Sequence, residues 1–159
     1  MYRMMAVAAS LMLMPVVAWA ASTANGGSAL ALAALVAEHS PLVTSFDKHK
    51  LARLFGGNSN VIYPPGRTIT VAIDKTVCKA SDVDIALHSC DLTFPSRTIS
   101  LTGRKAHELY ATIAEVGVRP DGAAGSIFEA LSQLTCTIDP NVIHQRAGGG
   151  ATCNFTPGP

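Results

Sequence analysis

Apolar and polar residues alternate along the middle of the chain, between about residues 60 and 102. Alternating side chains lie on opposite faces of a β-strand, so one face of each strand is expected to be buried. Turn residues separate the alternating segments, which favours an antiparallel sheet with short connections. The side chains expected to face inward are Ile69, Val71, Ile73, Val83, Ile85, Leu87, Cys90, Leu92, Phe94, Ile99 and Leu101.

Helical spacing precedes these strands, over residues 28–57. A first helix is expected to begin at Ser28 and to end before Pro41, because proline cannot continue a helix. A second helix is expected to be capped by Ser40-Pro41 or by Ser45. It is expected to stop at Gly56-Gly57, since glycine readily adopts the left-handed conformation that ends helices. The apolar side of this second helix is expected to consist of Phe46, Leu51, Leu54 and Phe55.

Helical spacing returns after residue 102, where apolar residues recur three and four positions apart. Two groups of residues with this spacing predict two helices, of which the first is amphipathic. The first group is Ala106, Leu109, Tyr110, Ile113 and Ala114, and the second is Ile127, Phe128, Leu131 and Leu134. Closing strands are expected around Cys136 and Cys153.

These elements predict an α+β fold, in which helices pack on one face of a small antiparallel sheet that disulfides staple. Residues 21–57 would form a helical N-terminal segment and residues 58–159 the α+β body. A chain of this length suits a single domain, so residues 21–159 are expected to fold as one unit.

The first 20 residues have the pattern of a cleaved secretory signal peptide. Arg3 supplies a positive charge, residues 4–17 are almost wholly apolar, and Ala18 and Ala20 are small residues at the positions that signal peptidase reads. The apolar run is shorter than the about 20 residues that a membrane-spanning helix needs. We therefore expect an exported protein, periplasmic or extracellular, with no stable membrane anchor in its mature chain.

Four cysteines follow the predicted signal. An even number in an exported chain indicates disulfides. The pairs Cys78–Cys90 and Cys136–Cys153 are favoured, because each would join neighbouring strands. The alternative is a zinc site of Cys78, His88 and Cys90, but their spacing lacks the paired C-x-x-C knuckles of structural zinc sites. No metal or other cofactor is therefore expected.

The charge of the mature chain argues against two classes of partner. Cleavage would remove one basic residue, Arg3, and leave 11 basic residues against 11 acidic ones. A nucleic-acid-binding protein usually carries an excess of basic residues, and so does a segment that binds membrane surfaces. Neither nucleic acid nor a membrane surface is therefore an expected partner.

Linear motifs for catalysis are lacking. Gly125-Ser126 lacks the surroundings of a hydrolase nucleophile elbow, and residues 148–150 lack the lysine of a phosphate loop. His107-Glu108 lacks the second histidine of a zinc protease motif. No catalytic residue is therefore assigned.

Two classes of function remain open. The favoured one is a binding or inhibitory module that contacts an extracytoplasmic protein. Two groups of residues are candidates for that contact: Ile143, His144 and Arg146 in the loop between Cys136 and Cys153, and Arg104, Lys105 and His107 at a helix start. The alternative is a small exported enzyme whose site is assembled from dispersed polar residues. The residues considered for that site are His39, His49, His107 and Asp121.

Overall fold

The computed structural model describes residues 21–57, 66–116, 127–140 and 150–157. The elements follow one another in the order β1 (Ser22–Asn25), α1 (Gly26–His39), α2 (Ser45–Phe55), β2 (Ile69–Ala80), the short 3₁₀ helix η1 (Ile85–Leu87), β3 (Ser89–Phe94), β4 (Arg97–Thr102), α3 (Gly103–Glu115), β5 (Ile127–Ile138) and β6 (Ala151–Pro157).

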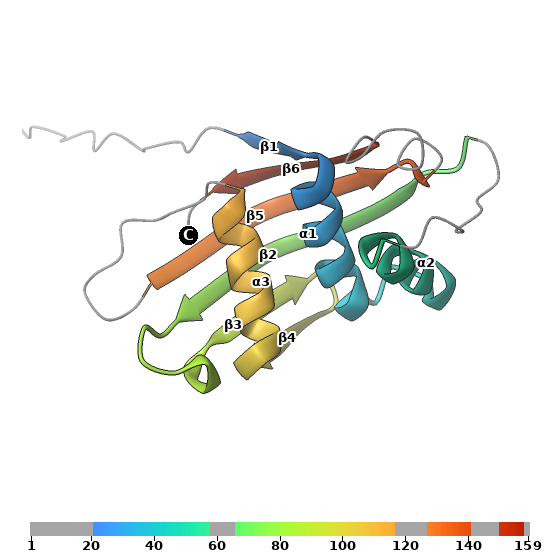
Figure 1. Cartoon of the computed structure of the whole chain (residues 1–159). Helices are drawn as coiled ribbons and strands as arrows, with labels where there is room; N and C mark the ends of the chain where they lie inside the picture. Colours follow the sequence, from blue (N-terminus) through green and yellow to red (C-terminus); the bar gives the residue numbers. More distant parts are fainter. Residues whose placement is uncertain (1–20, 58–65, 117–126, 141–149, 158–159) are drawn as a thin grey trace, which may run out of the picture.

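The six strands of the described residues form one antiparallel sheet in the order β1-β6-β5-β2-β3-β4. The strands β2, β3 and β4 form the expected meander, but the chain then crosses back through α3 and adds β5 on the other side of β2. Figure 1 shows α1 and α3 side by side on one face of the sheet, with α2 beside α1. The predicted α+β class, with helices on one face, is therefore confirmed.

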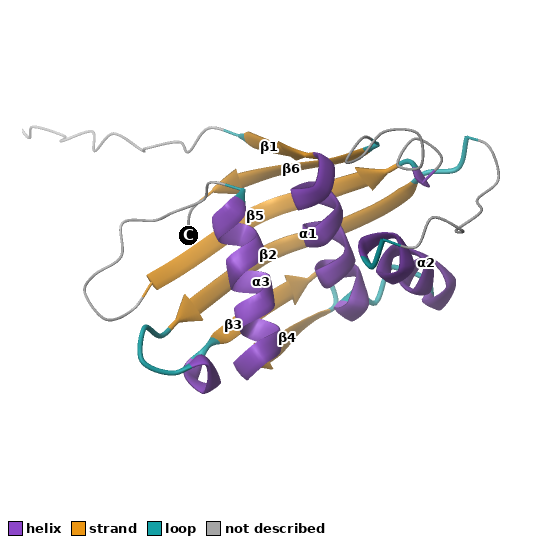
Figure 2. Ribbon diagram, viewed as in Figure 1, coloured by secondary structure: helices purple, strands orange, loops and turns teal. Residues whose placement is uncertain are grey.

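The hydrophobic core lies between this face of the sheet and the two helices. Figure 2 shows the two layers, with the helices in purple and the strands in orange. Helix α1 contributes mainly alanines, whose small side chains let it lie close to the strands, and Leu32 and Val36 fill the remaining space. Helix α3 contributes Leu109 and Ile113, both fully buried. Burial of each such side chain stabilises the fold by roughly 1.5–3 kcal/mol.

Two disulfides join neighbouring strands and confirm the predicted pairing. Cys78 on β2 lies opposite Cys90 on β3, and Cys136 on β5 lies opposite Cys153 on β6. No free cysteine remains in the described part of the chain. The four sulfur atoms are buried in the core, so the bridges tie together four of the six strands.

The helix predicted over residues 127–134 is wrong, because this segment belongs to β5 in the middle of the sheet. A β-bulge interrupts the pairing of β5 with β6 between Ser132 and Thr135, and Gln133 has a φ of 53°. A bulge shifts the alternation of a strand by one residue. Leu131 and Leu134 therefore both face the core although they are three positions apart, which is the spacing that imitates a helix.

The strand predicted through Val83, Ile85 and Leu87 is also wrong. Val83 lies in a bend after the end of β2, and Ile85 and Leu87 belong to the short helix η1. Their side chains are exposed, and the core that they were expected to reach is filled by other residues. Strand β1, over Ser22–Asn25, was not predicted from the sequence and forms an edge of the sheet beside β6.

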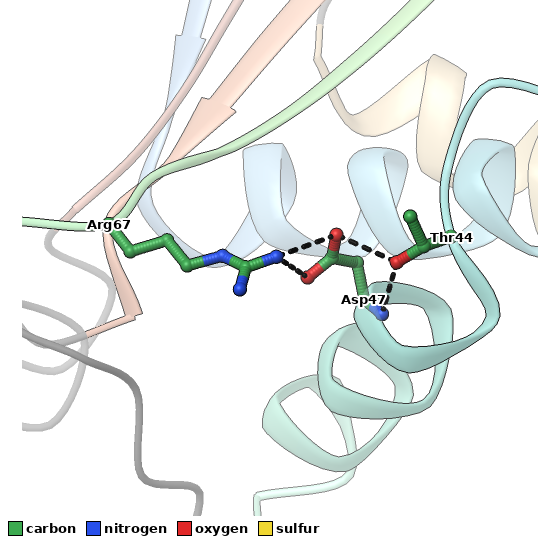
Figure 3. A network of polar contacts seen from close by, with 3 residues as sticks. All are labelled: Thr44, Asp47 and Arg67. Atoms are coloured by element: carbon green, nitrogen blue, oxygen red, sulfur yellow. Dashed lines mark hydrogen bonds and ion pairs between the residues drawn. The ribbon is translucent and has the colours of Figure 1, made fainter.

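Helix α2 is capped by Thr44, whose hydroxyl accepts a hydrogen bond from the backbone N–H of Asp47 at 3.1 Å. The carboxylate of Asp47 in turn accepts hydrogen bonds from Arg67 at 3.2 and 3.4 Å, as Figure 3 shows. This network joins the start of α2 to the residues that lead into β2. The side chain of Phe46, expected in the core, is instead exposed and lies beneath the Arg67 guanidinium at 5.7 Å. Phe55 at the end of α2 is also exposed.

The predicted signal peptide, residues 1–20, lies outside the described residues. Among the helices of the described segments, none is long and apolar enough to cross a membrane.

Candidate functional site

The connection between β2 and β3 is a loop closed at its base by the Cys78–Cys90 disulfide. Beyond the disulfide the two strands continue for one more pair, Lys79 with Ser89. Strand β2 ends at Ala80, and the remaining residues, 81–88, form a bend and η1. We call residues 79–89 the β2–β3 loop.

Two side chains of the β2–β3 loop bind the backbone of the loop itself. The Ser81 hydroxyl accepts hydrogen bonds from the backbone N–H of Val83 at 3.2 Å and of Asp84 at 3.5 Å. The Asp84 carboxylate accepts one from the N–H of Ala86 at 2.9 Å and so caps η1. Local bonds of this kind fix a turn without help from the rest of the fold.

The tip of this loop carries three apolar side chains on its surface. Val83 is 85% exposed, Ile85 is 50% exposed and Leu87 is 64% exposed. Single exposed apolar residues are ordinary on protein surfaces, whereas large contiguous apolar patches mark interaction surfaces. Three such residues within five positions, on a loop held by a disulfide, make this the candidate site.

A buried histidine fastens the loop to α3. His88 is 5% exposed, and its Nε2 lies 2.9 Å from the carbonyl oxygen of Ser81. A carbonyl oxygen only accepts hydrogen bonds, so Nε2 carries the proton and donates it. The carbonyl of His88 accepts a hydrogen bond from the N–H of Gly103, the first residue of α3, at 2.9 Å.

The other ring nitrogen of His88 faces a second histidine. Nδ1 of His88 and Nδ1 of His107 are 3.3 Å apart, and the two rings meet edge to face with centroids 4.9 Å apart. The ring of Tyr110 lies on another side of His88, with centroids 5.8 Å apart. The structure thus brings together two histidines that are distant in the sequence, one from the loop and one from α3.

The two predicted basic contact residues lie on the first turn of α3, near the β2–β3 loop. Arg104 pairs with Glu108 one turn later, with 3.3 Å between Nε and Oε1. The Lys105 ammonium donates to the Glu38 carboxylate of α1 at 2.9 Å. Both cations therefore have partners within the chain, and exposed ion pairs of this kind contribute little stability.

The loop between Cys136 and Cys153 leaves the sheet at the opposite end. Cys136 pairs with Val71 near the start of β2, whereas Cys78 lies near the end of that strand. The predicted contact residues Ile143, His144 and Arg146 lie outside the described residues. That part of the prediction therefore stays a prediction.

A shallow apolar depression lies between the three helices. Ala34 and Leu35 of α1, Phe55 of α2 and Ala111 of α3 line two adjoining hollows of about 290 and 400 Å³. Glu38, Lys48, His107 and Glu108 stand among the polar residues that line them. The depression is open and its charges are mixed, so it does not define a ligand.

The dispersed polar residues considered for an enzyme are not joined in the described part of the chain. No hydrogen bond or ion pair there links His39, His49 and His107 to one another. Burial lowers the pKa of His39 below 6.5, which opposes the effect of the neighbouring Glu38 carboxylate. Asp121 lies outside the described residues.

Comparison of the chain with known protein families, with curated proteins and with solved structures finds no match. Sequence reasoning also missed the β2–β3 loop as a site, because its alternating apolar residues looked like another buried strand. The signal that could have revealed it is the pair Asp82 and Asp84, since aspartates favour turns and are rare inside strands.

Proposed function

We propose that this protein is a binding module that acts outside the cytoplasm and holds a partner protein through the β2–β3 loop. The observation that carries the proposal is the exposure of Val83, Ile85 and Leu87 at the tip of a loop that a disulfide and internal hydrogen bonds keep in place. A loop already ordered before binding loses less conformational entropy when the complex forms.

The chemistry of the loop indicates the kind of partner. Three aliphatic side chains favour an apolar recess, since contact with it removes their surface from water. Asp82 and Asp84 stand beside them and are exposed. A recess with a basic rim would complement these carboxylates and orient the loop. The partner is therefore expected to be an extracytoplasmic protein with such a recess.

Export is supported by two independent features. The first 20 residues have the tripartite signal pattern, and two disulfides in a small domain suit an oxidising compartment. We predict that the exported chain begins at Ala21. Sequencing the N-terminus of exported material tests this, and a retained Met1 on that material would contradict it.

Photo-crosslinking in the native cells tests the binding surface. A photoreactive amino acid at Leu87 should crosslink the chain to one partner protein. The same amino acid at Thr70, an exposed position on the sheet, should not. A third position, His144, reports on the loop between Cys136 and Cys153.

The outcomes separate the two loops, because the loops leave the sheet at opposite ends. A crosslink from Leu87 alone supports the β2–β3 loop as the contact. A crosslink from His144 alone would move the contact to the other loop and overturn the proposal. Equal yields from Leu87 and Thr70 would show random collision and would also overturn it.

A further inference from the structure

We propose that His88 and His107 form a binding site for a divalent transition metal ion, with Zn²⁺ the best match. The two ring nitrogens face each other across 3.3 Å. Imidazole nitrogen is a good ligand for Zn²⁺, Cu²⁺ and Ni²⁺. The site does not depend on the proposed partner, because both ligands belong to this chain.

The separation of the two nitrogens fits a shared metal ion. Zn–N bonds are about 2.0–2.1 Å long, so two nitrogens on a tetrahedral zinc are about 3.3–3.4 Å apart. The observed Nδ1···Nδ1 distance is 3.3 Å. Without an ion, the same distance accommodates one N–H···N hydrogen bond between the rings.

The protonation of His88 also fits a ligand. Its Nε2 donates to the Ser81 carbonyl at 2.9 Å, so in the neutral ring Nδ1 carries a lone pair that faces His107. A metal-bound histidine typically donates its other N–H to a backbone carbonyl or a carboxylate, which fixes the ring and makes it a better ligand. The contact with the Tyr110 ring helps to hold the same orientation.

The binding step needs only a shift of a proton within His107. In the metal-free pair, His107 donates its Nδ1 proton to Nδ1 of His88. When zinc binds, two Zn–N bonds form, the hydrogen bond breaks, and the proton of His107 moves to Nε2 through solvent. No oxidant or reductant is needed.

His88 is buried and His107 is half-buried, so any solvent ligands would reach the ion from the side of His107. Within the described ranges, no group of three or more histidine, cysteine, aspartate or glutamate side chains is placed to hold one ion. The nearby Cys78 and Cys90 are bonded to each other and supply no thiolate. Water would therefore complete the coordination, in contrast to structural zinc sites, which are closed by four protein ligands.

The ion would link the β2–β3 loop to α3, because His88 lies in the loop, directly after η1, and His107 lies on the helix. An ion that binds only the folded state stabilises that state. Zinc should therefore raise the melting temperature of the oxidised protein.

Titration of the mature, oxidised protein with Zn²⁺ tests the site by calorimetry. Wild type should bind one equivalent. The variants His107→Ala and His88→Gln should each weaken binding at least about tenfold, since even the loss of an outer partner costs about 10- to 100-fold. The glutamine keeps a donor for the Ser81 carbonyl. His49→Ala, which removes an exposed histidine of α2, is the matched control and should change nothing.

Cu²⁺ offers a second readout, because its electron paramagnetic resonance spectrum reports coordinated nitrogens. Wild type should show two imidazole nitrogens, and His107→Ala should show fewer. No saturable Zn²⁺ binding to wild type would overturn the proposal. Binding that is unchanged in His107→Ala would also overturn it, even if His88→Gln fails to fold.

Discussion

Glu38 and His39, at the end of α1, have shifted pKa values that make the stability of the protein depend on pH. The hydrogen bond from Lys105 lowers the pKa of Glu38 below 4.5, and partial burial opposes this effect. Burial lowers the pKa of His39 below 6.5, because the charged ring loses hydration inside the protein. Both shifts mean that the unfolded chain binds protons more readily than the folded chain.

The stability of the protein should therefore fall as the pH drops below about 6.5, the unfolded pKa of histidine. Neutral His39 contributes stability above that pKa, and the contribution is lost on acidification because the unfolded chain gains its proton first. The variant His39→Gln should show a shallower fall between pH 7 and pH 5. Urea unfolding of wild type and variant at a series of pH values measures this difference in the free energy of unfolding.

The exposed His49 on α2 provides the control for this effect. The variant His49→Gln should keep the pH dependence of the wild type. If His39→Gln also shows the pH dependence of the wild type, burial of His39 is not the source of the acid sensitivity.

Strand β5 shows why a local pattern misled the prediction of one element. Leu131 and Leu134 are buried three positions apart, which is helical spacing. The bulge at Gln133 produces the same spacing in a strand, because one extra residue reverses the alternation. Tertiary pairing with β2 and β6 determines the outcome, and no window of local sequence contains that information.

The backbone conformation of Gln133, in the bulge, predicts how a glycine at this position changes stability. Gln133 has a φ of 53°, a left-handed conformation that costs an ordinary residue roughly 1–2 kcal/mol. Glycine avoids this cost but loses about 0.5–1 kcal/mol in chain entropy. The variant Gln133→Gly should therefore be neutral or more stable by up to about 1.5 kcal/mol. Denaturant unfolding measures the change.

The variant Thr135→Gly, two residues later on the same strand, is the control. Thr135 is exposed on the same strand but has no positive φ. Glycine there gains nothing and should destabilise by about 0.5–1 kcal/mol. Equal losses at the two positions would contradict the strain assigned to Gln133.

Helix α3 was predicted correctly, because its apolar stripe is continuous and regular. Leu109 is 1% exposed and lies in the core. The variant Leu109→Ala should destabilise by about 2–5 kcal/mol through lost contacts and the cavity left behind. Thermal or denaturant unfolding gives the value.

Glu115, at the exposed end of the same helix, is the comparison. Replacement by alanine should change stability by less than about 0.5 kcal/mol. Small and equal effects at Leu109 and Glu115 would contradict the packing of α3 on the sheet.

At the scale of the whole molecule, the sequence was sufficient for the fold class and for both disulfides. Alternation and cysteine count are strong signals, and they placed β2, β3, β4 and β6. The short edge strand β1 lacks a distinct pattern and is held mainly by pairing with β6. The position of β1 therefore depends on β6, a strand that is distant in the sequence.

The candidate site was harder to predict than the fold. The alternation of Val83, Ile85 and Leu87 shows that these side chains would lie on one face of a strand. It does not show whether that face meets the core or the solvent. His88 and His107 meet only because β3 and α3 pack together, and they are 19 positions apart in the chain. Convergence of this kind is a property of the tertiary fold.

The central claim is that the exposed apolar tip of the β2–β3 loop makes the contact with a partner. The most direct measurement is the dissociation constant of the complex with the partner identified by crosslinking. The variant with Val83, Ile85 and Leu87 all changed to serine should bind at least about tenfold more weakly, which corresponds to about 1.4 kcal/mol. Leu42→Ser, at a residue as exposed as Leu87 but outside the loop, should bind as wild type does. An unchanged dissociation constant for the folded triple variant would contradict the account.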